Sequence, residues 1–177
     1  WYPPPAEWAK NDKPTPPGPG NPLGLVKMAL SDGILFHGTN KEKTVGTPAS
    51  HGCMRMFNKD AVEVAWYLQT TFSGRTDPAL METYKKNRKT TYVVSLDLPV
   101  PVGLIYKPVV LRGDVLLFFP DIYRKLIRKD AAIREEILAS GAPEACIDDA
   151  KVKELAKSWP KKGTEISVKS LLAESCN

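Results

Sequence analysis

Short runs of apolar residues predict strands in the first two thirds of the chain. Residues 25–30 and 33–36 form two such runs, separated by the turn sequence Ser31-Asp32-Gly33. In 91–98 apolar residues fall at every second position, which predicts a strand with one buried face. Residues 109–119 predict a hairpin, because two β-branched and aromatic runs flank a Gly-Asp pair.

Two helices are predicted between these strands. Asn58 is a suitable N-cap for a helix over 59–70, where apolar residues recur at helical spacing. Asp77-Pro78 then predicts a second helix, because a capping residue precedes a proline at the first helical position. This helix is expected to reach about Asn87, within a lysine-rich insertion that is either a lid over a crevice or a spacer.

The last third of the chain has a helical pattern. Apolar residues recur at helical spacing from Ile122 to Leu138, and Ser140-Gly141 is a C-cap signal. A shorter helix is predicted near 147–159, followed by a strand near 165–171. No motif in this third indicates a chemical function.

Proline dominates the first 22 residues, which hold eight of the 16 prolines in the chain. Such a segment cannot supply a central strand or a helix interior. Its composition is compatible with a linker, but the aromatic residues Trp1, Tyr2 and Trp8 favour docking against a surface.

Length, charge and hydropathy exclude several classes of protein. The 177 residues suit one domain with or without an appendage, and no apolar run approaches the ~20 residues of a membrane span. The net charge of +5 favours residence near an anionic polymer. No aromatic-basic surface accompanies the short lysine pairs, so no nucleic-acid partner is expected. No leader sequence is visible, so any export signal is expected to have been removed or to lie outside this sequence.

The three cysteines differ in their surroundings. Cys146 and Cys176 lie far from any histidine, whereas Cys53 lies in a glycine-containing loop beside one. In a secreted protein the first two would form a disulfide and leave Cys53 free. The alternative is three reduced thiols in the cytosol. We favour the disulfide, because it leaves unpaired the cysteine with chemical neighbours.

Both histidines of the chain lie within 16 residues of Cys53. His37 ends a predicted strand, and a return of the chain would bring its imidazole within ~3 Å of the thiol. An imidazole or a helix N-terminus beside a thiol favours the nucleophilic thiolate. His37 and Cys53 are therefore candidate base and nucleophile. Gly52 allows close backbone approach, so the N–H groups of Gly52 and Cys53 are a candidate oxyanion hole.

Three other interpretations of these residues compete. His37 could be an ordinary hydrogen-bonded histidine at a strand end, and Cys53 an inert buried thiol. The polar neighbours of Cys53 argue against an apolar niche. A zinc site formed by His37, His51 and Cys53 lacks a suitably placed fourth ligand. No metal or other cofactor is therefore expected.

Two stretches contain the candidate residues, Phe36-His37-Gly38-Thr39 and Ser50-His51-Gly52-Cys53-Met54-Arg55-Met56. Together they closely resemble the active-site signature of the L,D-transpeptidase (YkuD-type) family. The segments 1–5 and 17–24 are similar to stretches that precede the signature, and 107–120 resembles the closing strands. The resemblance covers roughly residues 1–121.

This resemblance implies an acyl transfer on peptidoglycan. Cys53 would attack the bond between diaminopimelate and D-alanine in a tetrapeptide stem, and His37 would shuttle the proton. The third member of the triad would be the backbone carbonyl of Gly38. His51 would shape the pocket and Arg55 would bind a substrate carboxylate. Ser50 would support the loop.

The resemblance also implies the architecture. We expect a mainly β protein, a sandwich-like mixed sheet with a helical insertion. Residues 1–121 would be the C-terminal part of the catalytic domain and 122–177 a helical extension packed on it. Family members carry strands upstream of this stretch, so we expect an unpaired sheet edge. A separate segment or chain would complete the domain. Peptidoglycan stem peptides are the expected partners, in the periplasm or elsewhere in the cell envelope.

Overall fold

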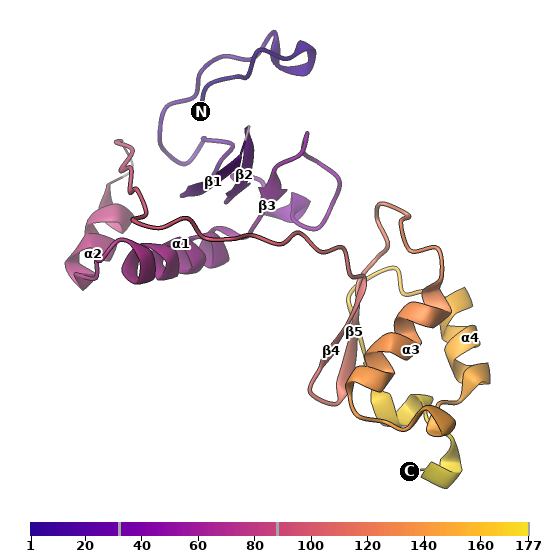
Figure 1. Ribbon diagram of the computed structural model, residues 1–177. Coiled ribbons are helices and arrows are strands. Elements are labelled where there is room, and N and C mark those ends of the chain that lie inside the picture. The colour runs from indigo at the N-terminus through magenta and orange to yellow at the C-terminus, as the bar shows by residue number, and fades with distance from the viewer. Residues whose placement is uncertain (32, 88, 177) are drawn as a thin grey trace. The chain divides into compact units, whose positions relative to one another are not determined.

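A computed structural model describes residues 1–31, 33–87 and 89–176 (Figure 1). Internal contacts divide the chain into unit 1, Trp1–Gly103, and unit 2, Leu104–Asn177. In this division the 109–119 hairpin falls in unit 2. The hairpin belongs to unit 2 because its second strand pairs with a strand near the C-terminus.

Unit 1 contains a small mixed sheet. Strand β1 (Lys27–Ser31) pairs antiparallel with β2 (Ile34–His37), and β2 pairs parallel with β3 (Met54–Arg55). The two strands predicted before residue 37 are therefore confirmed, while Asp32 of the predicted turn lies outside the described residues. Among the described residues β1 has β2 as its only strand neighbour, so its other edge is unpaired, as expected.

Helix α1 (Asn58–Phe72) follows the sheet, and α2 (Pro78–Lys86) follows α1. Asp77 caps α2 as predicted, because its Oδ1 accepts a hydrogen bond from Ala79 N at 2.9 Å. The predicted cap of α1 is wrong: Asn58 is the first helical residue and its side chain binds elsewhere. Glu42 Oε1 accepts the hydrogen bond from Asn58 N instead, at 2.8 Å.

No strand forms in 91–98, which corrects the sequence prediction. A strand needs a neighbour for its backbone groups. Here Asp97 N donates to Phe72 O at 2.7 Å, a single contact with the end of α1. Several apolar side chains of this stretch remain exposed, including Val93 and Leu98. Alternation of apolar residues was therefore insufficient without a pairing partner.

Unit 2 is built on an antiparallel sheet in the order β4 (Val109–Arg112), β5 (Val115–Phe118), β6 (Thr164–Ser167). Helices α3 (Lys129–Ala139) and α4 (Asp149–Lys157) contact each other, and α3 contacts β4. The hairpin is confirmed. The sheet and the helices enclose one core of buried side chains: Val109, Leu116, Phe118, Ile133, Ile137, Ile147, Val152, Val168, Leu171 and Leu172.

Two elements of unit 2 are shorter than predicted. Residues 122–128 are not helical, because the Asp121 carboxylate accepts hydrogen bonds from Lys125 N and Leu126 N and holds a turn there. The last strand ends at Ser167, where a 3₁₀-helix (Val168–Leu171) begins and buries Val168 and Leu171. Because these two apolar side chains are buried in the 3₁₀-helix, the apolar pattern continues beyond the end of the strand, and the predicted strand was too long.

A disulfide joins Cys146 to Cys176 and leaves Cys53 as the free cysteine. Inside unit 2, the buried Glu136 carboxylate accepts hydrogen bonds from Lys107 Nζ and from Leu111 N, the latter at 2.7 Å. These links tie the helices to the sheet and to the C-terminal segment. Unit 2 therefore has a core and a covalent crosslink of its own.

The expected fold class is only partly supported. The mixed sheet and the helical insertion are present, but the four α-helices hold more residues than the six strands do. A mainly β protein is therefore not confirmed. Among the described residues, no helix is both long and apolar enough to cross a lipid bilayer.

Candidate active site

His37 is the last residue of β2 and is buried, with 4% of its surface exposed. Its Nδ1 is in hydrogen-bond contact with the backbone carbonyl of Gly38. A carbonyl oxygen only accepts, so Nδ1 must carry the proton. The neutral imidazole then has its free lone pair on Nε2, as a general base requires.

The surroundings of His37 keep the ring neutral. Burial lowers the pKa of His37 below its ordinary value of 6.5, and the positive charge of Arg55 lowers it further. The hydrogen bond to Gly38 acts in the opposite direction and raises the pKa, but burial outweighs it. The imidazole is therefore available as a proton acceptor at neutral pH.

Cys53 lies one residue before β3 and is half-buried. Strands β2 and β3 run parallel, with Phe36 opposite Met54 and His37 opposite Arg55. Cys53 immediately precedes Met54, so it lies at the start of the strand next to β2. The Sγ atom lies 3.5 Å from Gly33 O. No hydrogen bond joins it to His37 within the described part of the chain, so the expected 3 Å contact is not formed here. The Ser50 hydroxyl donates to Cys53 O, which closes the loop before β3.

The loop before Cys53 has an unusual backbone and an aromatic contact. Gly52 has φ +124°, a conformation that residues with a Cβ rarely adopt. The His51 ring stacks on Trp8 with centroids 4.1 Å apart and the two planes 1° from parallel. The proline-rich segment therefore does dock, and it docks on the loop that carries Cys53.

Arg55 lies on β3 beside His37 and has one unsatisfied donor. Its Nη1 donates to Thr44 Oγ1 at 2.9 Å, while its buried Nε has no hydrogen-bond partner among the described residues. A buried N–H group without an acceptor is costly. An incoming acceptor such as a carboxylate would relieve that cost.

Asn58 is a site residue whose position in the sequence indicated only a helix cap. Its Oδ1 accepts from Leu25 N at 3.0 Å and its Nδ2 donates to Thr39 O at 2.8 Å. The amide thus joins the segments on either side of the β1–β2 hairpin to the start of α1. A Cβ on Gly24 or Gly38 would come within 2.2 Å of Asn58 Oδ1, so both positions exclude a side chain.

This contact fixes the backbone that orients His37, since Gly38 lies between His37 and Thr39. In the sequence, Gly24 and Gly38 indicate two places where the backbone has no room for a side chain. The sequence does not indicate that Asn58 fills the space at both, because Asn58 is 20 or more residues away. No group of three or more potential metal ligands is found among the described residues.

Three comparisons with known proteins bear on this site. The family model described as the L,D-transpeptidase catalytic domain matches residues 1–102, which contain the whole site. The match ends before the hairpin of unit 2, so it is shorter than the resemblance expected over residues 1–121. No solved structure matches the chain.

Curated relatives match over shorter stretches. A putative L,D-transpeptidase in the ATP synthase subunits region of Fuscovulum blasticum is 37% identical over 67 residues, 36% of this chain and 35% of that protein. Putative L,D-transpeptidase YkuD of Bacillus subtilis is 46% identical over 48 residues, 27% of this chain and 29% of that protein. Probable L,D-transpeptidase YbiS of Escherichia coli K12 is 42% identical over 45 residues, 25% of this chain and 15% of that protein.

The matched stretches thus span about a third or less of each of these relatives. The family model, in contrast, covers more than half of this chain and includes every residue from His37 to Asn58. The chain therefore belongs to the L,D-transpeptidase catalytic domain family.

Proposed function

We propose that this protein is a peptidoglycan L,D-transpeptidase in which Cys53 is the nucleophile and His37 the general base. The observation that carries the proposal is the contact between His37 Nδ1 and the Gly38 carbonyl. It supports a neutral ring whose Nε2 can take a proton from a thiol.

The proposed reaction has two acyl-transfer steps. Nε2 of His37 takes the proton of Cys53, and the thiolate attacks the diaminopimelate carbonyl of a tetrapeptide stem. The C–N bond to D-alanine breaks, the leaving amine takes the proton back, and a thioester remains. An acceptor amine then attacks the thioester and loses its proton to His37. The Cys53 sulfur leaves as the thiolate, and a new amide is formed.

The first step requires a rotation of the Cys53 side chain. In the free protein Sγ points to Gly33 O, 3.5 Å away. Catalytic contacts are often long in free enzymes and shorten when the substrate is bound. We propose that the stem peptide replaces the Gly33 contact and turns Sγ towards His37. The N–H groups of Gly52 and Cys53 would then bind the oxyanion.

Arg55 is proposed to hold a carboxylate of the stem. Its buried Nε lacks an acceptor among the described residues, and a bidentate carboxylate would engage Nε together with a second guanidinium nitrogen. His51 is proposed to shape the pocket, a role supported by its stacking on Trp8. Ser50 is proposed to hold the loop through its bond to Cys53 O.

Two alternatives differ from this proposal in the fate or existence of the thioester. In an L,D-carboxypeptidase water replaces the acceptor amine, and the product is a shortened stem. In a non-catalytic wall-binding module no thioester forms. The ordered tautomer of His37 favours an enzyme over the binding module, because binding alone does not need a base.

The experiment is to incubate the intact protein with tetrapeptide muropeptides and identify the products by mass. Crosslinked dimers are the expected products, and tripeptide stems alone would instead indicate the carboxypeptidase. Cys53→Ala and His37→Ala should both lose more than about a hundredfold in rate. Lys13→Ala, at an exposed position of the same unit, is the control and should keep full activity. Full activity of Cys53→Ala would contradict both enzymatic proposals.

We further propose that the protein acts in the cell envelope, on peptidoglycan stem peptides. The Cys146–Cys176 disulfide supports this placement, because disulfides persist in oxidising compartments. Thiol titration of the protein isolated without reductant tests it. One free thiol per chain is expected, whereas three would contradict it.

A further inference from the structure

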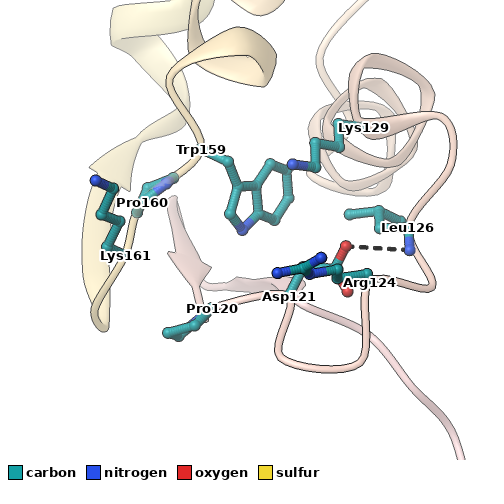
Figure 2. Close-up of a pocket in the computed structure, with 8 residues that line it drawn as sticks. All are labelled: Pro120, Asp121, Arg124, Leu126, Lys129, Trp159, Pro160 and Lys161. Atoms are coloured by element: carbon teal, nitrogen blue, oxygen red, sulfur yellow. Dashed lines mark hydrogen bonds between the residues drawn. The ribbon is translucent and has the colours of Figure 1, made fainter.

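An open hollow lies in unit 2 between the turn after β5 and the segment that joins α4 to β6 (Figure 2). Its volume is about 540 Å³, within the range of small-ligand sites. The eight residues that line it are Pro120, Asp121, Arg124, Leu126, Lys129, Trp159, Pro160 and Lys161. All belong to unit 2, and none takes part in the site around Cys53.

Trp159 forms a fixed apolar wall of this hollow. Its Nε1 donates to Phe119 O at 2.9 Å, and the Phe118 ring meets it edge-on with centroids 5.2 Å apart. The ammonium of Lys129 lies over the indole, 5.4 Å from the ring centroid. The indole is therefore held in place before any ligand arrives, which lowers the entropic cost of binding.

Three positively charged side chains line the hollow together with Trp159 (Figure 2). Among the described residues Arg124, Lys129 and Lys161 form no ion pair. Asp121 is the single acid of the hollow, and its oxygens accept from Tyr106 Oη at 2.7 Å and Leu126 N at 3.2 Å. The charge of Lys129 already acts on Asp121, so Arg124 and Lys161 are the cations left to attract an anionic ligand.

Arg124 has a further peculiarity. Its φ is +51°, and it is the one residue other than glycine with positive φ in the described part of the chain. Such a conformation costs of order 1 kcal/mol or more and is concentrated at functional sites. Here the residue with the strained backbone is one that lines the hollow (Figure 2).

We propose that this hollow binds a saccharide that carries carboxylates. One face of a pyranose ring presents C–H groups, which pack on the electron-rich face of an indole. The carboxylates would pair with Arg124 and Lys161, with Lys129 adding to the field. The site is independent of Cys53 chemistry. Only its natural ligand, a peptidoglycan glycan strand without stem peptides, in which the muramyl carboxylates are free, rests on the proposed function.

The test measures dissociation constants of the intact protein by calorimetry for four soluble probes. These are the N-acetylglucosamine–N-acetylmuramic acid disaccharide, an oligogalacturonate, neutral diacetylchitobiose and a free tetrapeptide. We expect the two acidic sugars to bind and the neutral sugar to bind at least about tenfold more weakly. Whichever of the two acidic sugars binds more tightly indicates whether the natural ligand is a peptidoglycan glycan or another acidic polysaccharide. Equal binding of diacetylchitobiose, or tighter binding of the tetrapeptide, would overturn the proposal.

The variants locate the site. Arg124→Gly removes the guanidinium and relieves the positive φ, so folding is preserved while affinity for the acidic sugars falls about tenfold. Lys161→Gln should act in the same direction. Lys153→Gln, an exposed lysine of α4 outside the hollow, is the matched control and should bind as the parent does. Unchanged affinity in Arg124→Gly and Lys161→Gln would refute the site.

A second readout separates this proposal from the proposed function. Acylation of Cys53 by a carbapenem, followed by mass spectrometry, should proceed equally in the parent and in Arg124→Gly. Loss of sugar binding with intact acylation supports a separate binding site. Absent acylation together with intact, variant-sensitive sugar binding would reject the enzyme but retain the site.

Discussion

His37 is buried, and a hydrogen bond fixes its tautomer. Together these two features predict that the stability of the fold depends on pH. Its pKa is lowered in the folded state, chiefly by burial. As pH falls below about 6.5, the unfolded chain takes up the proton first, so the stability contributed by the neutral ring is lost. Above about pH 6.5 that contribution is complete.

The measurement compares urea unfolding of the parent and of His37→Gln at pH 7.5 and pH 5. The parent should lose more free energy of unfolding than His37→Gln over this interval. Asn11→Ala, at an exposed position of the same unit, serves as the control, with a loss close to that of the parent. Identical losses in the parent and His37→Gln would contradict a lowered pKa.

Gly52 predicts an effect of backbone conformation. A Cβ at this position would meet no neighbouring atom within 4 Å, so space is not the constraint. With φ +124°, Gly52→Ala should cost about 1–3 kcal/mol or force the loop into another conformation. The rate of Cys53 acylation by a carbapenem should therefore fall markedly. Gly20→Ala, where φ is not positive and space is also open, should change neither stability nor rate.

At the scale of elements, the start of α1 organises the site. Asn58 joins α1 to Leu25 and Thr39 through one amide. Asn58→Ala removes both hydrogen bonds and leaves Leu25 N and Thr39 O without these partners. The expected cost is about 2–3 kcal/mol, with looser positioning of Gly38. Asn58→Asp should retain the contact with Leu25 N but not the donor to Thr39 O.

Two measurements test the role of Asn58. Urea unfolding gives the loss of stability, for which exposed Asn11→Ala is the control. Nitrogen NMR of the imidazole reports whether His37 keeps its proton on Nδ1. A general loss of stability would not change the position of this proton, whereas a loss of positioning would. A fixed Nδ1 tautomer in Asn58→Ala would show that Asn58 does not position His37.

Elements that depend on local signals were predicted well. Asp77-Pro78 set the start of α2, and the Gly-Asp pair set the β4–β5 turn, because capping and turn geometry involve neighbouring residues. The strand at 91–98 and the helical start near Ile122 were wrong. A strand depends on a distant partner, and the Asp121 side chain competes with the helix for backbone N–H groups.

At the scale of the whole molecule, the two units differ in what stabilises them. The described apolar residues buried in unit 1 are Ala9 and Ala61, while hydrogen bonds such as those of Asn58 hold its loops. Unit 2 has ten buried apolar side chains and the disulfide. The two units should therefore respond differently to a reducing agent.

Loss of the disulfide should destabilise unit 2 selectively. Cys146 and Cys176 are separated by 30 residues, so the crosslink contributes about 3–4 kcal/mol if loop entropy dominates. In Cys146→Ser/Cys176→Ser, hydrogen exchange should accelerate in β4–β6 and α3–α4 but not in β1–β3. Cys53→Ser, which removes the free thiol, is the control. Equal acceleration in both units would show that they unfold together.

By itself the sequence indicated the family and most helix and turn positions, and it predicted His37, Gly52, Cys53 and Arg55 as site residues. These features depend on residue identity and on near neighbours, which a sequence displays directly. Tertiary structure decided the division at Gly103, the role of Asn58 and the hollow around Trp159. Each of these depends on contacts between residues far apart in the chain, and no local pattern encodes which distant groups will meet.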